Sequence, residues 1–272
     1  MASTIQPIFL LADSQLLFWR DEQGRRFLDR ARELIAAAEP EKTPKAAYLG
    51  ASNGDAPEFY DLFVGAMAEI GIRDCRHVPS DPTAEDLAFL DEADLVLLAG
   101  GDVRQGWEIF QKTGLKDRIV QRYYAGAVLV GVSAGAVQLG LKGWDPDSSS
   151  LFDTFCLVPF LIDAHDEPSW SGLLRAVPRA GEHARGLGIP SGGGALYHPD
   201  YSVEPVRHPV AEVDMAENAE NGPRLALLFP GEGKEVPADA AADTGPRILS
   251  QEELLDHVLR DLDGSGSEDK AN

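Results

Sequence analysis

Ser133 is the residue whose surroundings most clearly indicate chemistry. It lies in GVSAGA (131–136), after an apolar run at 127–132 and before small and apolar residues at helical spacing. A strand, a sharp turn and a helix in this order push a serine Oγ out of a sheet, and flanking glycines let the backbone approach itself closely. We expect Ser133 to be a nucleophile, with the alternative that a serine between two glycines is only a turn residue.

A serine nucleophile needs a base, and histidine is the usual one because its unperturbed pKa is about 6.5. His165 follows an expected strand at 155–162, at the end of the sheet where Ser133 should emerge, so we expect His165 to be this base. His77 closes another strand and is expected to be structural. The remaining four histidines lie in polar or helical surroundings: His183, His198, His208 and His257.

Acyl transfer also needs N–H donors for the oxyanion of its tetrahedral intermediate. The residue after the nucleophile usually provides the first donor, and that residue is Ala134. The turn GGD (100–102) offers a second donor, the N–H of Gly101, since no side chain screens it. Alone, this turn would be only a tight strand-to-helix connection, but next to the serine strand we favour Gly101 as an oxyanion donor.

Strands and helices alternate along the first half of the chain. The expected strands are 5–12, 46–50, 72–78, 93–99 and 127–132, and the expected helices are 25–38, 58–70, 84–90, 103–111 and 115–124. This order predicts an α/β fold, a three-layer sandwich with a mostly parallel central sheet. Ligands bind beyond the carboxyl ends of such strands, where we expect Asn53 and Asp102 to contact the substrate.

The second half has weaker signals. Residues 141–153 predict a polar loop near the site, and the remaining expected elements are strands at 155–162, 184–189, 201–206 and 224–229 and helices at 170–180 and 250–262. We expect one domain over 1–263, followed by a disordered acidic and polar tail over 264–272.

Composition excludes several classes of partner. The chain of 272 residues has 24 Lys and Arg against 45 Asp and Glu, a net charge of -21 that repels nucleic acid and anionic lipid. A cationic or zwitterionic small substrate agrees with this charge, but a solvated acidic surface explains it better. No signal peptide or membrane-length apolar run is evident, so a cytoplasmic protein is expected. Cys75 and Cys156 have no metal-ligand spacing and are expected to be buried free thiols.

Together, the segments 47–55, 97–102 and 131–136 resemble the S51 serine peptidases, the family of aspartyl dipeptidases and cyanophycinases, with a class I glutamine amidotransferase-like fold. The resemblance covers about 46–189. It implies that Ser133 is the nucleophile, that His165 is the base and that Gly101 helps to form the oxyanion hole. It also implies a small aspartyl-containing peptide as substrate, cleaved without a metal or cofactor.

Two segments depart from the family pattern. Cyanophycinase-like members carry an acidic residue after a Gly-Ile strand end to orient the histidine, whereas here Ile189 is followed by PSGGG (190–194). The residues that could orient His165 instead are Asp145, Asp147, Asp163, Asp166 and, by a weaker neutral hydrogen bond, Ser191. The second departure is LADS (11–14), where many members have a glycine-rich turn.

Several alternatives follow from these departures. A catalytically impaired S51-like homologue that binds a small amino-acid-like ligand or a protein partner is the main one, because the third triad member is not evident. A glutamine amidotransferase is disfavoured because that chemistry uses cysteine where Ser133 stands. A carboxylesterase would place its histidine near the C-terminus, where His257 lies in an expected surface helix. The α- or β-aspartyl linkage and a homodimer both stay open.

Overall fold

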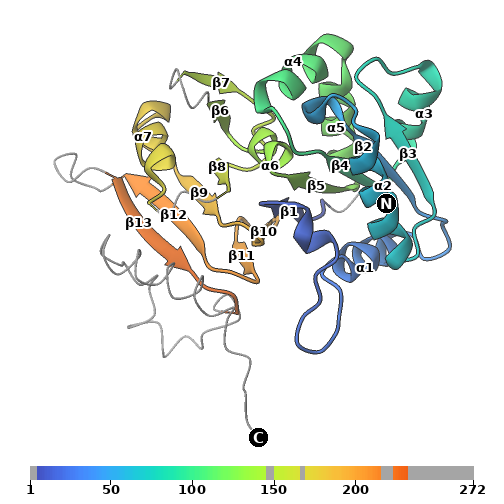
Figure 1. Ribbon diagram of the computed structural model, residues 1–272, viewed down its shortest axis with the longest axis horizontal. Helices are drawn as coiled ribbons and strands as arrows, with labels where there is room; N and C mark the ends of the chain where they lie inside the picture. The colour runs from blue at the N-terminus through green and yellow to red at the C-terminus, as the bar shows by residue number, and fades with distance from the viewer. Residues whose placement is uncertain (1–4, 145–149, 166–168, 216–222, 232–272) are drawn as a thin grey trace, which may run out of the picture.

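A seven-stranded sheet forms the centre of the fold in a computed structural model that describes residues 5–144, 150–165, 169–215 and 223–231 (Figure 1). The strand order is β11-β10-β1-β5-β4-β2-β3. The strands are β1 (Ile8–Leu11), β2 (Lys45–Leu49), β3 (Asp74–Val78), β4 (Leu95–Leu98), β5 (Val128–Val132), β10 (Gly194–Tyr197) and β11 (Val203–Val206). The first five pair in parallel, and β10 and β11 extend the sheet in antiparallel orientation.

Helices cover both faces of this sheet. One face packs against the short 3-10 helix η1 (Ser14–Leu17), α1 (Asp29–Ala38) and α2 (Pro57–Glu69). The other packs against α3 (Ala84–Glu92), α4 (Val103–Thr113), α5 (Leu115–Tyr124) and α6 (Ala134–Leu139). The central strands β4 and β5 are therefore buried along their whole length, which explains their nearly continuous apolar sequence. The predicted three-layer α/β fold with a mostly parallel sheet is confirmed.

A second sheet of four strands packs beside the first, in the order β13-β12-β9-β8. It comprises β8 (Leu161–Ala164), β9 (Gly186–Ile189), β12 (Val210–Met215) and β13 (Pro223–Leu228). Helix α7 (Ser171–Ala180) lies against it, and Trp170, Leu173 and Val213 belong to their own buried cluster (Figure 1). Across the described ranges, no helix has the length and apolar character needed to cross a membrane.

The sequence-based expectations are wrong at several places in the second half. Residues 141–153 include two strands that pair in antiparallel orientation, β6 (Lys142–Trp144) and β7 (Leu151–Asp153), rather than only a loop. The strand expected at 155–162 begins only at Leu161, because the preceding backbone binds the end of α6: the N–H of Phe155 donates to Gln138 O. Strands β10 and β12 were not expected. The predicted helix at 250–262 and the tail at 264–272 lie outside the described residues.

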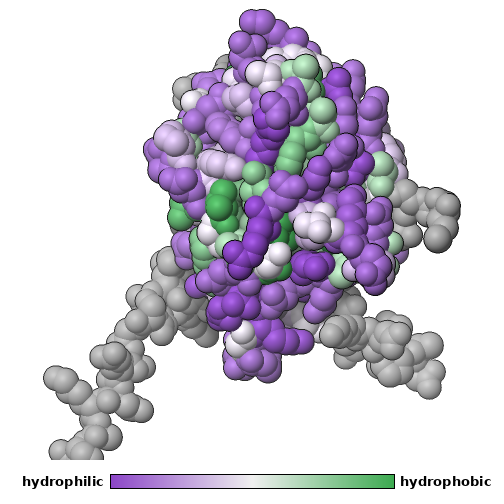
Figure 2. All heavy atoms as spheres, turned by 90° about the vertical axis from the view of Figure 1, so that its right-hand side faces the viewer, coloured by the Kyte–Doolittle hydropathy of each residue, from purple (hydrophilic) through white to green (hydrophobic). Residues whose placement is uncertain are grey.

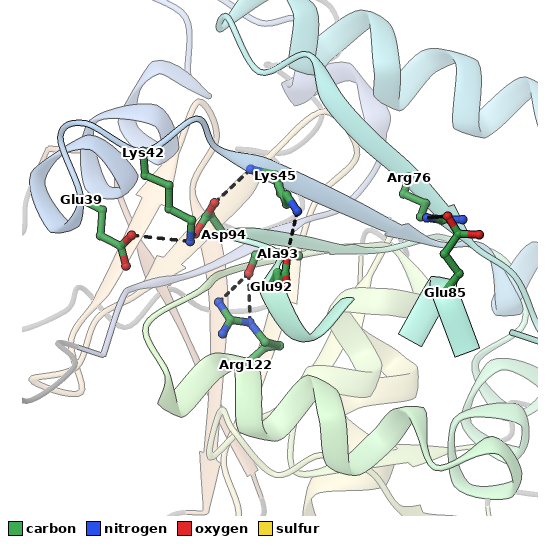
Figure 3. Close-up of polar contacts among 9 residues, drawn as sticks. All are labelled: Glu39, Lys42, Lys45, Arg76, Glu85, Glu92, Ala93, Asp94 and Arg122. Carbon is green, nitrogen blue, oxygen red and sulfur yellow. Dashed lines mark hydrogen bonds and ion pairs between the residues drawn. The ribbon is translucent and has the colours of Figure 1, made fainter. Parts of the chain in front are cut away.

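Asp94 links the amino ends of β2 and β4 (Figure 3). These strand ends lie at the opposite end of the parallel strands from Ser133. Its carboxylate accepts from Lys42 Nζ at 2.6 Å and from the Lys45 N–H at 2.9 Å, and the side chain is almost fully buried. The neighbouring pair of Lys45 Nζ and Glu92, also at 2.6 Å, is exposed. Burial makes the Asp94 contacts stronger than the exposed pair, because water screens them less.

We predict that Asp94→Asn lowers the free energy of unfolding by about 1–3 kcal/mol, because Lys42 loses its 2.6 Å contact with a mostly buried carboxylate and keeps the exposed Glu39 carboxylate at 3.6 Å. Urea denaturation at neutral pH measures this change. The matched control is Glu92→Gln, which removes an exposed ion pair and should leave the unfolding midpoint nearly unchanged. Equal losses in the two variants would contradict the role assigned to Asp94.

Candidate active site

Ser133 occupies a strained turn between β5 and α6. Its backbone has φ 51° and ψ -111°, a conformation that a non-glycine residue rarely adopts, and its N–H donates to Leu11 O at 2.8 Å. A Cβ atom on Gly135 would lie 2.2 Å from Leu98 O, and one on Gly131 would lie 2.7 Å from Ala136 Cα. Both flanking glycines are therefore required by close backbone packing. The strand, turn and helix expected around Ser133 are present.

His165 reaches Ser133 from the second sheet. It directly follows β8, and its N–H donates to Ile189 O at the end of β9, at 3.2 Å. Its Nε2 lies 2.6 Å from Ser133 Oγ. In the tautomer with the proton on Nδ1, Nε2 is unprotonated and can accept the proton of the serine hydroxyl. The structure thus brings together the two residues that the sequence suggested as nucleophile and base.

The turn after β4 contacts both Ser133 and the loop after β2. Gly101 has φ +130°, and a Cβ atom there would lie 2.1 Å from Ser52 O. A Cβ atom on Gly100 would lie 3.2 Å from the Cβ of Ser133. Ala134, the other expected oxyanion donor, is buried at the start of α6. These positions place Gly100 and Ala134 beside the serine, while the oxyanion role of Gly101 and Ala134 stays a prediction.

A cavity of about 360 Å³ opens beside Ser133 and His165. Its apolar lining comprises Leu17, Phe59, Leu62, Phe63, Leu97, Ala99 and Val132. Its polar lining includes Asp13, Ser14, Tyr48 and Asn53, and the Asn53 amide donates to Tyr48 Oη at 2.8 Å. Asn53 therefore lies where a substrate contact was expected. The cavity is apolar for most of its surface, as ligand sites commonly are.

Asp102 lies in the turn after β4, beyond the carboxyl end of that strand. It is the N-cap of α4, and its Oδ1 accepts from the Gln105 N–H at 2.8 Å. It is absent from the described lining of the cavity. Its carboxylate thus stabilises the first turn of a helix, and the substrate contact proposed for it stays a prediction.

Two of the candidate orienting residues, Asp163 and Ser191, lie within the described residues. Asp163 lies on β8, and its Oδ2 is 3.7 Å from where a Cβ of Gly172 would stand, so its carboxylate faces the first turn of α7. Ser191 is exposed in the turn after β9. Three further candidates lie outside the described residues: Asp145, Asp147 and Asp166. The identity of the third triad member stays a prediction.

Asp13 has a place in the site that sequence reasoning did not assign. Its Oδ2 accepts from the Gly192 N–H at 2.6 Å, its Oδ1 accepts from the Gln15 N–H at 2.8 Å, and it lines the cavity. It therefore connects the end of β1 to the turn after Ile189, the position where the family resemblance implies an acidic residue. The only sequence signal was the departure at 11–14 from a glycine-rich turn.

Gln138 is a second residue that the sequence interpretation missed. It is fully buried on α6, and its Nε2 donates to Ser52 Oγ at 3.0 Å and to Val103 O at 2.9 Å. It thereby joins α6, the helix that follows Ser133, to Ser52 in the loop that packs against Gly101. A single amide in an otherwise apolar segment, AVQLGL (136–141), was the available signal.

Neither cysteine lies in the lining of this cavity. Burial raises the pKa of the Cys75 thiol to about 11, so that this side chain stays protonated at neutral pH and is a poor nucleophile. Cys75 is half-buried and Cys156 is exposed, so the expectation that both thiols are buried is wrong for Cys156. Ser133 is therefore the nucleophile that the geometry supports.

Sequence comparisons place this chain among peptidases. It matches Peptidase family S51 over residues 8–167, more than half of its length. It is 30% identical to Peptidase E of Streptomyces coelicolor over 154 residues, which cover 53% of this chain and 60% of that protein. It is 27% identical to the uncharacterized peptidase YgaJ of Bacillus subtilis over 100 residues, 35% of this chain and 41% of the relative. Both matches span less than two thirds of the relative.

Solved structures share the fold. A crystal structure of a peptidase from an acI-B1 actinobacterium superposes with a TM-score of 0.60 at 15% identity, covering 85% of this chain and 97% of the other. A candidate peptidase E protein from Listeria monocytogenes EGD-e gives 0.50 at 15% identity, covering 75% and 99%. At such identities the likeness shows the fold alone. The S51 match itself includes both Ser133 and His165, and this chain belongs to peptidase family S51.

Proposed function

We propose that this S51 peptidase is a serine-type hydrolase of small peptides, with Ser133 as the nucleophile and His165 as the base. The observation that carries the proposal is the 2.6 Å separation of Ser133 Oγ and His165 Nε2, between residues 32 positions apart in sequence. A hydrogen bond of this length allows direct proton transfer from the hydroxyl to the imidazole. The strained turn at Ser133 and the adjoining cavity support the same assignment.

The proposed reaction proceeds through an acyl-enzyme. His165 Nε2 accepts the Ser133 proton while Oγ forms a bond to the carbonyl carbon, and the N–H groups of Gly101 and Ala134 donate to the oxyanion. The C–N bond then breaks, and His165 returns the proton to the leaving amine. Water attacks the acyl-enzyme with His165 again acting as base, which releases the acid and restores Ser133.

An aspartyl-containing peptide, of the dipeptidase E or cyanophycinase type, is the finer assignment implied by the family resemblance. The Streptomyces coelicolor relative is named Peptidase E, which supports this assignment through a match over 60% of that protein. A cytoplasmic location stays a prediction.

The alternative is a catalytically impaired homologue that binds a small ligand or a protein partner. The observation in its favour is the turn after Ile189, which carries no carboxylate of its own and is held by Asp13 instead. Without an acid on Nδ1, the imidazolium formed during attack would be less stable. The contact between Ser133 and His165 favours activity, and hydrolysis assays separate the two possibilities.

We predict that Ser133→Ala reduces turnover at least about a thousandfold, because the acyl-enzyme cannot form. Mass spectrometry of a panel of α-aspartyl, β-aspartyl and unrelated dipeptides measures this loss. Ser202→Ala, at an exposed serine between β10 and β11, is the control and should retain wild-type rates. Wild-type activity in Ser133→Ala would rule out the proposed nucleophile. Ligand binding without turnover in the unmodified enzyme would support the impaired homologue.

We predict that Gly101→Ala lowers kcat about a hundredfold, because its Cβ would collide with Ser52 O and displace the proposed oxyanion donor. Steady-state kinetics and thermal unfolding should be measured together. Gly114→Ala is the control, since Gly114 also has a positive φ, +75°, but no atom would contact a Cβ there within 4 Å. The control should lose about 1 kcal/mol of stability and keep its kcat. An unchanged kcat in Gly101→Ala would contradict the oxyanion role.

A further inference from the structure

Tyr48 and Asn53 form a hydrogen-bonded pair on the wall of the active-site cavity. Tyr48 lies on β2, Asn53 ends the short 3-10 helix η2 (Ala51–Asn53) that follows, and both side chains line the cavity beside Ser133. Asn53 Nδ2 donates to Tyr48 Oη at 2.8 Å, and Asn53 Oδ1 accepts from the Ala56 N–H at 3.3 Å. The contact with Ala56 uses the amide oxygen, so the amide nitrogen, a donor, faces the tyrosine.

This pair can donate two further hydrogens. Asn53 supplies the hydrogen of the shared bond, so the hydroxyl hydrogen of Tyr48 is not used in it. The Asn53 amide carries two hydrogens, and the shared bond uses one of them. Burial raises the pKa of Tyr48, so the hydroxyl stays protonated at neutral pH and remains a donor. One O–H and one N–H are therefore available to an acceptor in the cavity.

Asn53 is connected to Ser133 through the turn after β4. A Cβ atom on Gly101 would lie 2.9 Å from the backbone nitrogen of Asn53, and one on Gly100 would lie 3.2 Å from the Cβ of Ser133. Close backbone contacts therefore run from Asn53 to the proposed nucleophile. When the carbonyl of a substrate residue lies at Ser133 Oγ, the side chain of that residue can extend through the shared cavity to Tyr48 and Asn53.

Asp13, a carboxylate in the cavity lining, lies on the other side of Ser133 from this pair. Asp13 comes just after β1, Ser133 comes just after β5, and the strand order β1-β5-β4-β2 places Ser133 between Asp13 and Tyr48. Repulsion between two carboxylates falls with the distance between them. An anionic substrate group is therefore repelled less beside Tyr48 and Asn53 than on the β1 side of the cavity.

A second carboxylate, that of Asp55, lies in the same loop as Asn53. Its Oδ1 is 3.3 Å from His77 Nε2, and its Oδ2 accepts from the Ser80 N–H at 2.9 Å. Both partners lie at the end of β3 or just after it. The Asp55 carboxylate is therefore turned toward β3, and it is absent from the described lining of the cavity.

Water reaches the α2 side of the cavity. Phe59 and Leu62 line this side and remain 45% and 42% exposed. The face on the right-hand side of Figure 1 accordingly shows apolar surface between hydrophilic residues (Figure 2). A carboxylate that accepts from the tyrosine and the asparagine can keep part of its hydration, which lowers the free-energy cost of placing a charge in a mostly apolar cavity.

We infer that Tyr48 and Asn53 bind the side-chain carboxylate of an aspartyl substrate residue, through the Tyr48 hydroxyl and the Asn53 amide, and select this residue at the carbonyl that Ser133 attacks. This inference rests on the proposed hydrolase function and assigns two residues to its substrate specificity. Hydrogen bonds to an ionised acceptor are stronger than those to a neutral one. The pair therefore favours aspartate over asparagine, whose side chain has the same shape without the charge.

We predict that Tyr48→Phe lowers the ratio of kcat/KM for aspartyl over asparaginyl α-p-nitroanilide about tenfold, because the carboxylate loses a donor. Steady-state kinetics of the full-length protein measures this ratio. The matched control is Tyr60→Phe: its ring lies 5.8 Å from that of Tyr48 and its hydroxyl donates to Cys75 O at 3.1 Å, but it is absent from the described lining. The control should keep the wild-type ratio. An unchanged ratio in Tyr48→Phe would contradict the inference.

Asn53→Asp tests both donors in one substitution of nearly equal size. The new carboxylate can still accept from the Ala56 N–H, but it also accepts the hydroxyl hydrogen of Tyr48 and adds a negative charge. We expect the ratio for aspartyl over asparaginyl substrate to fall at least about a hundredfold, further than in Tyr48→Phe. A ratio equal to that of the wild type would overturn the inference.

Ligand binding separates this inference from the hydrolase function. Ligand-observed NMR, which needs no turnover, compares the binding of aspartic acid α-amide and asparagine α-amide to Ser133→Ala with their binding to Ser133→Ala/Tyr48→Phe. Weaker binding of the aspartate amide alone to the double variant supports the inference even where no p-nitroanilide is hydrolysed. Equal binding to the two proteins, or no binding of this amide to Ser133→Ala, contradicts it. Hydrolysis that depends on Ser133 but not on Tyr48 overturns the inference and leaves the hydrolase function intact.

Discussion

The close packing of α6 against the end of β4 is the constraint on which the rest of the site depends. No side chain can be accommodated at Gly135, because Leu98 O occupies the space where its Cβ would stand. The short helix therefore starts directly after β5, and Ser133 must take up the strained turn that joins them. Protein interiors are packed too densely to relax such a contact, so the direction of Ser133 Oγ is set by the backbone.

The proposed base comes from a different sheet from the proposed nucleophile. Ser133 ends a strand of the central sheet, whereas His165 ends β8 of the four-stranded sheet, whose pairing with β9 places Ala164 opposite Ile189. The site therefore exists only when the two sheets are docked together. Gln138 and Asp13 contribute to the same arrangement. Near the site, Gln138 contacts Ser52 and Asp13 contacts Gly192, and in both pairs the residues are distant in sequence.

The proposed catalytic groups and the apolar side of the cavity come from different parts of the fold. The proposed nucleophile, base and oxyanion donors lie at strand ends and in the turns that follow them. The apolar side of the cavity comes mainly from η1 and α2, which cover one face of the central sheet. Side chains at exposed positions of α2 can therefore change without disturbing the contact between Ser133 and His165.

Local sequence patterns determined the elements of the first half. The apolar runs of β4 and β5, the helix after β3 and the turn around Ser133 depend on neighbours in sequence, and each is present as predicted. Only the tertiary structure decided that 155–160 packs as a loop, that Asp13 holds the turn after Ile189, and that an apolar cavity adjoins Ser133. Those features arise from contacts between segments distant along the chain, and the periodicity of a single segment carries no information about them.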